Sequence, residues 1–333
     1  MKRLLVFFGV VFMTICSAVN AQEVPDISLD ARFGYNQDFA GGPGRFSGDG
    51  LYLDINGSIN PHFSYSLNHR IAAPAYGEGI TGFDATNWLT LTYEIGNFAI
   101  TAGKDALMVG SFEYDAYDLD TYYDMNSMFY NMLDCWQWGV YGTWYPTDSQ
   151  SLILQFANSP FSGDQNMFSY NAAWRGEWDF YESYWSVNMW QYDKSKYVKA
   201  LNLGNRFYLG GLTFDLEYMT RSANIGNMFK EDFTLIAAPS YEIGSWCRLL
   251  GKFGWEKAAE DLPYELAYED YLGSDYLFYG AGAEFFPIKG SKDVRIHAVW
   301  SSNNFGDNFL NVGLTWKFDL TSAGKRLLNS LKK

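Results

Sequence analysis

Apolar and polar residues alternate in short segments along most of the chain. A repeat of two predicts a β-strand with one apolar and one polar face. In residues 167–178, for example, Phe168, Tyr170 and Trp174 alternate with polar or small residues. We predict sixteen such strands, over residues 27–36, 49–59, 62–71, 87–95, 97–105, 136–145, 151–157, 167–178, 183–192, 199–209, 212–220, 232–243, 247–256, 275–286, 294–301 and 308–318.

The connections between the predicted strands alternate in length. Short turns fall at residues 60–61, 96–97, 146–150, 210–211 and 244–245, and longer connections at 37–48, 72–86, 106–135, 158–166, 222–231 and 257–274. Outer-membrane barrels have short periplasmic turns and longer extracellular loops. We therefore expect an all-β fold, a 16-stranded antiparallel transmembrane β-barrel over residues 22–318. An even strand number places both ends of the barrel on the periplasmic side.

Composition and the N-terminus support a location in the outer membrane of a Gram-negative bacterium. Aromatic residues make up 19% of the chain, which fits a barrel with an aromatic girdle at each lipid interface. Residues 1–21 predict a secretory signal peptide, because Lys2 and Arg3 precede a short apolar run and Ala21 ends a small-residue cleavage site. The run is shorter than the roughly 20 residues that a membrane anchor needs. A lipoprotein would use Cys16, but Ile15 before it is too bulky for that signal.

The two remaining cysteines and the C-terminus complete the predicted barrel. Cys135 and Cys247 fall at opposite ends of their strands, too far apart for a disulfide, so we predict two free thiols. The last strand ends with Trp316 and Phe318, which resembles the signal that outer-membrane insertion machinery reads. Residues 319–333 form a basic periplasmic tail. It resembles a short amphipathic helix, but we favour a frayed, solvated end.

The longest connection, residues 106–135, is the candidate for function. It is apolar and aromatic, it contains no Lys or Arg, and a long insertion in a compact β-protein is usually functional. We predict that it folds into the lumen and narrows it. Five of its acidic residues are expected at the constriction: Glu113, Asp115, Asp118, Asp120 and Asp124.

The polar faces of the predicted strands carry a second, basic set. We expect these side chains on the lumen wall: Arg32, Arg70, Arg175, Arg206, Arg248, Arg295 and Lys317. A basic wall that faces an acidic loop would create a field across the pore and set its ion preference. Alternatively, these residues only neutralise acids of the lumen. The hairpin at 210–211 places Arg206 opposite Asp215, so we expect that pair to cancel.

Several short motifs carry a family resemblance. AGK at 102–104, FEYD at 112–115, Asp120, FYN at 129–131 and CWQWGV at 135–140 resemble the third-loop region of the phosphate-selective porin O and P family. The resemblance implies an outer-membrane porin with a sixteen-stranded barrel, usually a homotrimer. Phosphate-selective members have a basic third loop and a pore lined with arginine and lysine. The third loop of this chain is acidic instead.

We therefore expect a passive diffusion channel for small hydrophilic solutes or ions, with a weak cation preference or near-neutral sieving. The first alternative is a phosphate- or anion-selective channel. The second, from another class, is an outer-membrane barrel enzyme such as a protease or lipase. Its candidate bases would be His62, His69 and His297, but none stands beside a serine in a recognisable motif, so we predict no enzyme and no cofactor. A purely structural or adhesive barrel is a third class, which the expected width disfavours.

A metal ion and a nucleic acid are both poor fits as partners. Oxygen-rich Asp115, Asp118, Asp120 and Asp124 could hold a calcium ion, but their spacing is not that of an EF-hand loop, and we favour no metal. The formal net charge of −14 makes a nucleic-acid partner a poor fit. The expected partners are outer-membrane lipid and small hydrophilic solutes.

Overall fold

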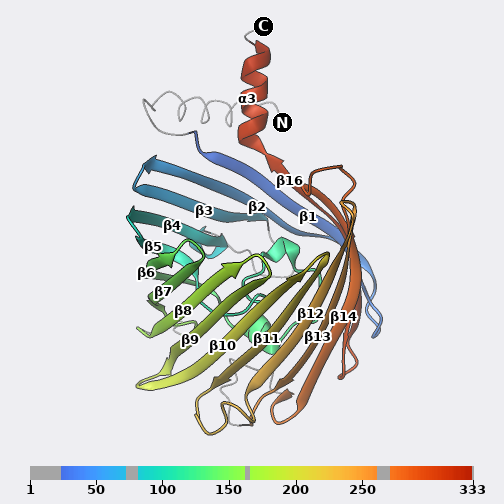
Figure 1. Ribbon diagram of the computed structural model, residues 1–333. Helices are drawn as coiled ribbons and strands as arrows, with labels where there is room; N and C mark the ends of the chain where they lie inside the picture. The colour runs from blue at the N-terminus through green and yellow to red at the C-terminus, as the bar shows by residue number, and fades with distance from the viewer. Residues whose placement is uncertain (1–23, 73–81, 162–165, 261–270, 332–333) are drawn as a thin grey trace.

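Sixteen antiparallel strands close into a barrel in the computed structural model, with β1 paired to β16 (Figure 1). The structure describes residues 24–72, 82–161, 166–260 and 271–331, so the predicted signal peptide, residues 1–21, lies outside them. The strands are β1 Asp26–Asp38, β2 Arg45–Asn60, β3 Phe63–Ala72, β4 Thr86–Ile95, β5 Phe98–Ala106, β6 Trp136–Thr147, β7 Gln150–Asn158, β8 Phe168–Trp178, β9 Tyr181–Asp193, β10 Lys196–Leu209, β11 Leu212–Ser222, β12 Phe233–Ile243, β13 Cys247–Lys257, β14 Asp275–Phe285, β15 Val294–Asn303 and β16 Asn308–Asp319.

All sixteen predicted strands are confirmed. The largest difference in boundary is at β2, which begins at Arg45 instead of residue 49. The reason is the hairpin with β1, whose pairing continues from Phe33 opposite Gly48 to Asn36 opposite Arg45. Backbone pairing extends this strand through residues that do not alternate in polarity.

Alternation along each strand separates an outer face from an inner one. In β7, Leu152, Leu154 and Phe156 are exposed, whereas Ile153 and Ala157 are buried. Leu154 is 70% exposed although it is strongly apolar. An apolar outer face of this kind is what a membrane barrel presents to lipid. The outward ring pair Phe98 and Trp144 stacks with centroids 6.3 Å apart, as expected of an aromatic girdle.

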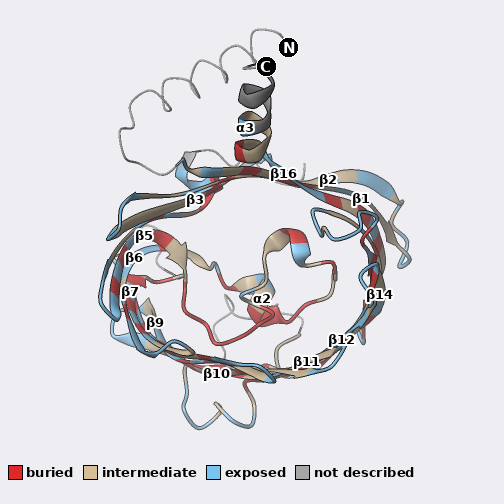
Figure 2. Cartoon of the chain, turned by 45° about the horizontal axis from the view of Figure 1, so that its top comes forward, coloured by how far each residue is buried: buried red, intermediate tan, exposed pale blue. Residues whose placement is uncertain are grey.

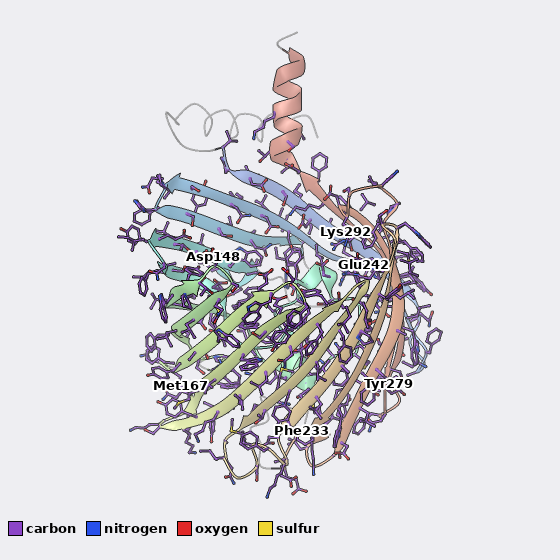
Figure 3. All side chains as sticks on the ribbon, viewed as in Figure 1. Asp148, Met167, Phe233, Glu242, Tyr279 and Lys292 are labelled. Carbon is purple, nitrogen blue, oxygen red and sulfur yellow. The ribbon has the colours of Figure 1, made fainter. Side chains whose placement is uncertain are left out.

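The short connections fall at the end of the barrel that carries the C-terminal helix. Asp148, Glu242 and Lys292 lie towards that end in Figure 3, and Met167 and Phe233 lie towards the other. Lys292 Nζ is 2.8 Å from Glu242 Oε1. Gly210 has a positive φ of 67°, which its two-residue hairpin turn requires and which glycine adopts without strain. Gly244 has a positive φ of 59° and begins the three-residue turn between Ile243 and Cys247.

The C-terminal tail forms a helix, α3 Leu320–Leu331, that contacts β1. Thr321 Oγ1 accepts a hydrogen bond from Ile27 N at 2.8 Å and donates one to Pro25 O at 2.8 Å. Asp319 Oδ1 accepts the N–H of Ser322 at 2.7 Å, as a helix cap does. The favoured interpretation of a frayed end is therefore wrong for the start of the tail. No helix in the described residues is long and apolar enough to cross a membrane.

Both cysteines of the described chain are free thiols, as predicted. Cys135 directly precedes β6, and Cys247 is the first residue of β13. The third cysteine of the sequence, Cys16, lies outside the described residues.

Candidate functional site: the segment between β5 and β6

Residues 107–135, which we call the β5–β6 segment, run between the end of β5 and the start of β6. The segment contains two short helices, η2 Asp118–Asp120 and α2 Met128–Met132. Figure 2 looks into the ring of strands and shows α2 inside it. Phe129 is fully buried and packs against Trp190 of β9, with ring centroids 5.8 Å apart. The apolar content of the segment is explained by this packing against the barrel.

Side chains of the wall accept the backbone N–H groups of the first half of the segment. Glu217 of β11 accepts from Phe112 at 2.8 Å and from Glu113 at 3.0 Å. Ser186 Oγ of β9 accepts from Gly110 at 2.8 Å. A non-regular stretch has no ladder partners for its N–H groups, and leaving them buried and unpaired would cost free energy. Polar wall residues supply those partners here.

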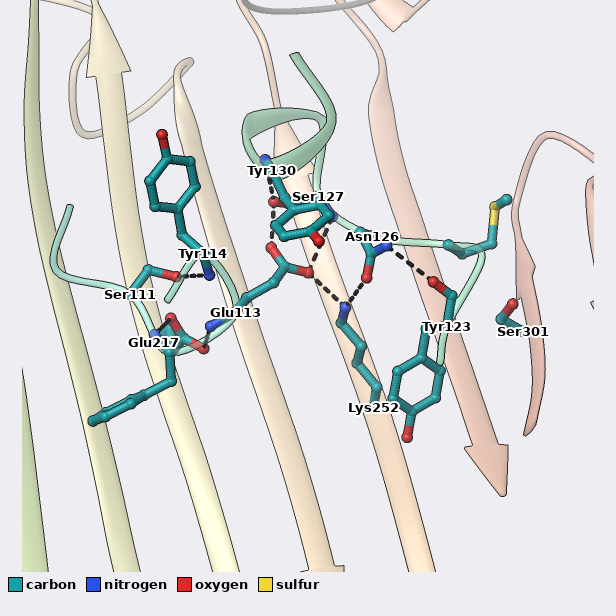
Figure 4. Close-up of polar contacts among 12 residues, drawn as sticks. Ser111, Glu113, Tyr114, Tyr123, Asn126, Ser127, Tyr130, Glu217, Lys252 and Ser301 are labelled. Carbon is teal, nitrogen blue, oxygen red and sulfur yellow. Dashed lines mark hydrogen bonds and ion pairs between the residues drawn. The ribbon is translucent and has the colours of Figure 1, made fainter. Parts of the chain in front are cut away.

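A buried ion pair holds the middle of the segment (Figure 4). Lys252 Nζ of β13 lies 2.6 Å from Glu113 Oε1, and the two side chains are only 6% and 5% exposed. Glu113 also accepts a hydrogen bond from Ser127 N at 3.2 Å and one from the Ser127 hydroxyl. Ser127 Oγ in turn accepts from Tyr130 N at 3.0 Å and so caps α2. One wall lysine and one loop carboxylate therefore fix both halves of the segment.

The other predicted acids each meet a different strand. Asp115 pairs with Arg175 of β8 at 2.7 Å, Asp118 with Arg70 of β3 at 2.9 Å, and Asp120 with Arg295 of β15. Asp124 Oδ1 accepts a hydrogen bond from Asn36 of β1 at 2.7 Å.

These pairings spread the acids around the wall. The structure does not gather Asp115, Asp118, Asp120 and Asp124 around a common point, and no group of metal-ligating side chains is found in the described residues. Four carboxylates that each have their own partner offer no shared coordination sphere for a calcium ion, which takes six to eight oxygen ligands.

The remaining predicted wall residues differ in their partners. Arg32 donates to the carbonyls of Asp118 at 3.3 Å and Thr121 at 2.8 Å, and it pairs with Asp49 at 3.0 Å. Arg248 pairs with Glu284 of β14.

Arg206 and Lys317 face acids of neighbouring strands. Arg206 bonds both oxygens of Asp215, at 2.6 and 2.9 Å, which confirms the predicted pair. Its guanidinium also lies 4.1 Å from the ring centroid of Phe112. Lys317 stands opposite Asp30 in the β1–β16 pairing.

Burial changes the acidity of one loop carboxyl. Desolvation raises the pKa of Asp124 to about 6, although the hydrogen bond from Asn36 and the charge of Arg32 act in the opposite direction. Its Oδ2 is buried and has no hydrogen-bond partner among the residues that the structure describes, which suits a protonated carboxyl. Asp124 is therefore a loop acid whose charge changes near pH 6.

The sequence model of the family "Phosphate-selective porin O and P" matches residues 31–188, just under half of the chain, from β1 to β9 with the β5–β6 segment included. This match confirms the family resemblance that the loop motifs carry. The protein is an outer-membrane porin. It is a non-enzymatic channel of the Gram-negative outer membrane.

Solved structures share the fold of this porin. A triple mutant of the Rhodopseudomonas blastica porin aligns with a TM-score of 0.60 and 14% identity, covering 89% of this chain and 100% of that one. A loop L8 deletion mutant of OmpT, an outer-membrane protein of Vibrio cholerae, aligns with a TM-score of 0.63 and 10% identity, covering 89% and 99%. No curated protein matches the chain by sequence.

The histidines of the porin have structural partners. His62 Nδ1 bonds Glu94 O at 3.0 Å, and His69 Nδ1 bonds Thr86 Oγ1 at 3.0 Å. His297 is buried, bonds Asn311 through Nε2 at 3.0 Å and stacks on Tyr122.

Sequence reasoning missed several inward-facing charges of the porin. They are Lys252, the buried pair of Arg221 and Glu256, and the wall acids Glu217 and Glu284. The alternation along the strands could have revealed them. Lys252 and Glu256 lie on the same face of β13 as Arg248, and Glu217 lies on the same face of β11 as Asp215. Following the inward-facing positions to the end of each strand would have identified these charged residues.

Proposed function

We propose that the β5–β6 segment is a constriction loop that lies in the lumen and narrows it, and that small hydrophilic solutes and ions diffuse past it. The observation that carries the proposal is the set of contacts from one loop to strands around the barrel, namely to β3, β8, β13 and β15. A sixteen-stranded barrel is wide enough to hold an aqueous channel. A loop fixed at several points of the wall can set the size of that channel.

The ion pairs support a nearly neutral constriction with at most a weak cation preference. Four of the five loop acids pair with a wall cation, and the fifth, Asp124, has a raised pKa. Opposite charges within about 4 Å largely cancel at distances beyond a Debye length of about 8 Å. The ion pairs therefore favour wall arginines that neutralise acids of the lumen over wall arginines that create a field across the pore.

Phosphate or anion selectivity is the second candidate, favoured by the family match. A phosphate would need arginines that are free to bind it. Arg70, Arg175 and Arg295 each hold a loop carboxylate instead. An anion would have to displace those carboxylates, so we place this function second.

Conductance of the purified protein in a planar bilayer tests both candidates. We expect open channels and a reversal potential close to zero, or slightly on the cation side, in a potassium chloride gradient. A membrane that stays silent would overturn the channel. Strong anion selectivity together with block of the chloride current by millimolar phosphate would establish the second candidate instead.

We further propose that the porin is exported by its signal peptide, is inserted by the outer-membrane insertion machinery, and assembles as a homotrimer. The family resemblance and the aromatic end of β16, where Phe318 is 50% exposed, support this. Cross-linking of the protein in intact outer membranes should give a trimer band. A protein that still migrates only as a monomer after cross-linking would exclude the trimer.

A further inference from the structure

A cavity of about 600 Å³ lies between the β5–β6 segment and the wall formed by β3 to β6. Its lining combines aromatic rings with carboxylates, among them Trp88, Trp136, Tyr117, Asp105 and Asp118. A volume of this size is typical of pockets that hold small molecules. Because the proposed constriction loop itself forms one side of the cavity, a solute bound there would lie against that loop.

Three aromatic rings from three parts of the chain gather in this cavity. Trp88 of β4 and Trp136 of β6 have ring centroids 5.6 Å apart with an angle of 40°, and Tyr117 of the segment lies 6.4 Å from Trp88. Trp88 Nε1 donates to Ser66 Oγ at 2.7 Å, which fixes the orientation of the indole. Rigid aromatic faces offer flat apolar contact next to polar groups at low entropic cost. They fit a ligand with a flat apolar face.

The carboxylates of the cavity are already partnered. Asp118 holds Arg70 at 2.9 Å and accepts the hydroxyl of Tyr52 at 2.9 Å. Asp105 accepts the hydroxyl of Tyr141 at 2.8 Å. A carboxylate has about four acceptor sites, so each can still accept further hydrogen bonds.

Partnered acids favour a neutral ligand over a cation. An organic cation would compete with Arg70 for Asp118, whereas a hydroxyl group can donate to the same carboxylate without breaking the ion pair. A pyranose ring combines the required features, because it presents C–H groups on its face and hydroxyls around its edge.

We propose that this cavity binds a neutral sugar of one or two rings, with Trp88, Trp136 and Tyr117 against the ring faces and Asp105 and Asp118 accepting its hydroxyls. The inference rests on the proposed diffusion function and gives that channel a preferred solute class.

Current through single channels in a planar bilayer tests the site, with maltose as the probe. We expect maltose to reduce the potassium chloride current in a saturable way. Trp88→Ala should raise the half-saturating concentration about tenfold, the ratio that 1.4 kcal/mol gives. Trp174→Ala is the matched control, because Trp174 of β8 packs against Trp185, whose indole is exposed on the outer face. It should leave the half-saturating concentration unchanged. If Trp88→Ala fails to assemble, Tyr117→Leu in the segment provides a second variant with the same expectation.

Three results would overturn the sugar site. One is an open channel on which maltose acts no differently from a polyethylene glycol of similar mass. Another is an equal maltose response in the wild type and in whichever of Trp88→Ala and Tyr117→Leu assembles. The third is block by an arginine salt at lower concentration than maltose, which would assign the cavity to organic cations. Conductance without sugar separates the two claims, because a silent channel contradicts the diffusion function, and an open channel without saturable block contradicts only the site.

Discussion

The β5–β6 segment is held to the wall by two kinds of ion pair. Glu113 and Lys252 are almost fully buried, and the carboxylate also binds the N-terminus of α2. Asp115 and Arg175 form a pair of similar length, but their side chains are 40% and 36% exposed. A buried pair is costly to break because the remaining charge is left without water, whereas an exposed pair is screened and contributes little. The same chemistry therefore anchors the loop at one point and adjusts its charge at the other.

The largest expected effect is at the buried pair. Glu113→Gln leaves the ammonium of Lys252 without its carboxylate in a buried site, so we expect a loss of about 3–5 kcal/mol in the free energy of unfolding. The measurement is the denaturant concentration at which half of the barrel is unfolded, with heat-modifiable migration on a gel as the readout of folded protein. The double variant Glu113→Gln with Lys252→Met should recover part of the loss. A single variant as stable as Asp115→Asn would remove the distinction between the two kinds of pair.

An intermediate effect is expected from the titration of Asp124. Its pKa is about 6 in the folded protein, against an ordinary value of 3.8. A raised acid pKa contributes stability that is fully present below pH 3.8 and is lost as the pH rises through 6, by up to about 3 kcal/mol. Asp124→Asn cannot ionise, so its unfolding free energy should fall less between pH 4 and pH 7 than that of the wild type. Parallel pH profiles of the two proteins would show that this carboxyl does not titrate in that range.

The smallest effect on stability is expected at the exposed pair. Asp115→Asn should change the free energy of unfolding by less than about 1 kcal/mol, because both side chains are in contact with solvent. Its effect on ion preference should nevertheless be measurable, since the charge of Arg175 is then no longer balanced. A denaturant curve and a reversal potential on the same preparation separate the two effects. A stability loss as large as that of Glu113→Gln would mean that the exposed pair is an anchor too.

Strands and anchors differ in how well the sequence predicts them. Each strand carries its own period of two, and the hairpin at Gly210 defines which residues face each other, so the Arg206–Asp215 pair follows from local sequence. The partners of the loop acids cannot be predicted from local sequence. Glu113 and Lys252, for example, are far apart in the chain and meet only because of the path that the segment takes. The helices η2 and α2 are too short to show a helical period. The aromatic cavity also arises between distant segments, so no local pattern marks it.

We propose that this loop, balanced by wall cations, controls passage through the barrel. Reversal potentials in a potassium chloride gradient test it most directly, on the wild type and on a variant with Glu113→Gln, Asp115→Asn and Asp118→Asn. Removing three carboxylates leaves Lys252, Arg175 and Arg70 unbalanced. We therefore expect a reversal potential near zero or slightly on the cation side in the wild type, and a clear shift towards anions in the variant. Equal reversal potentials and conductances in the two proteins would contradict it.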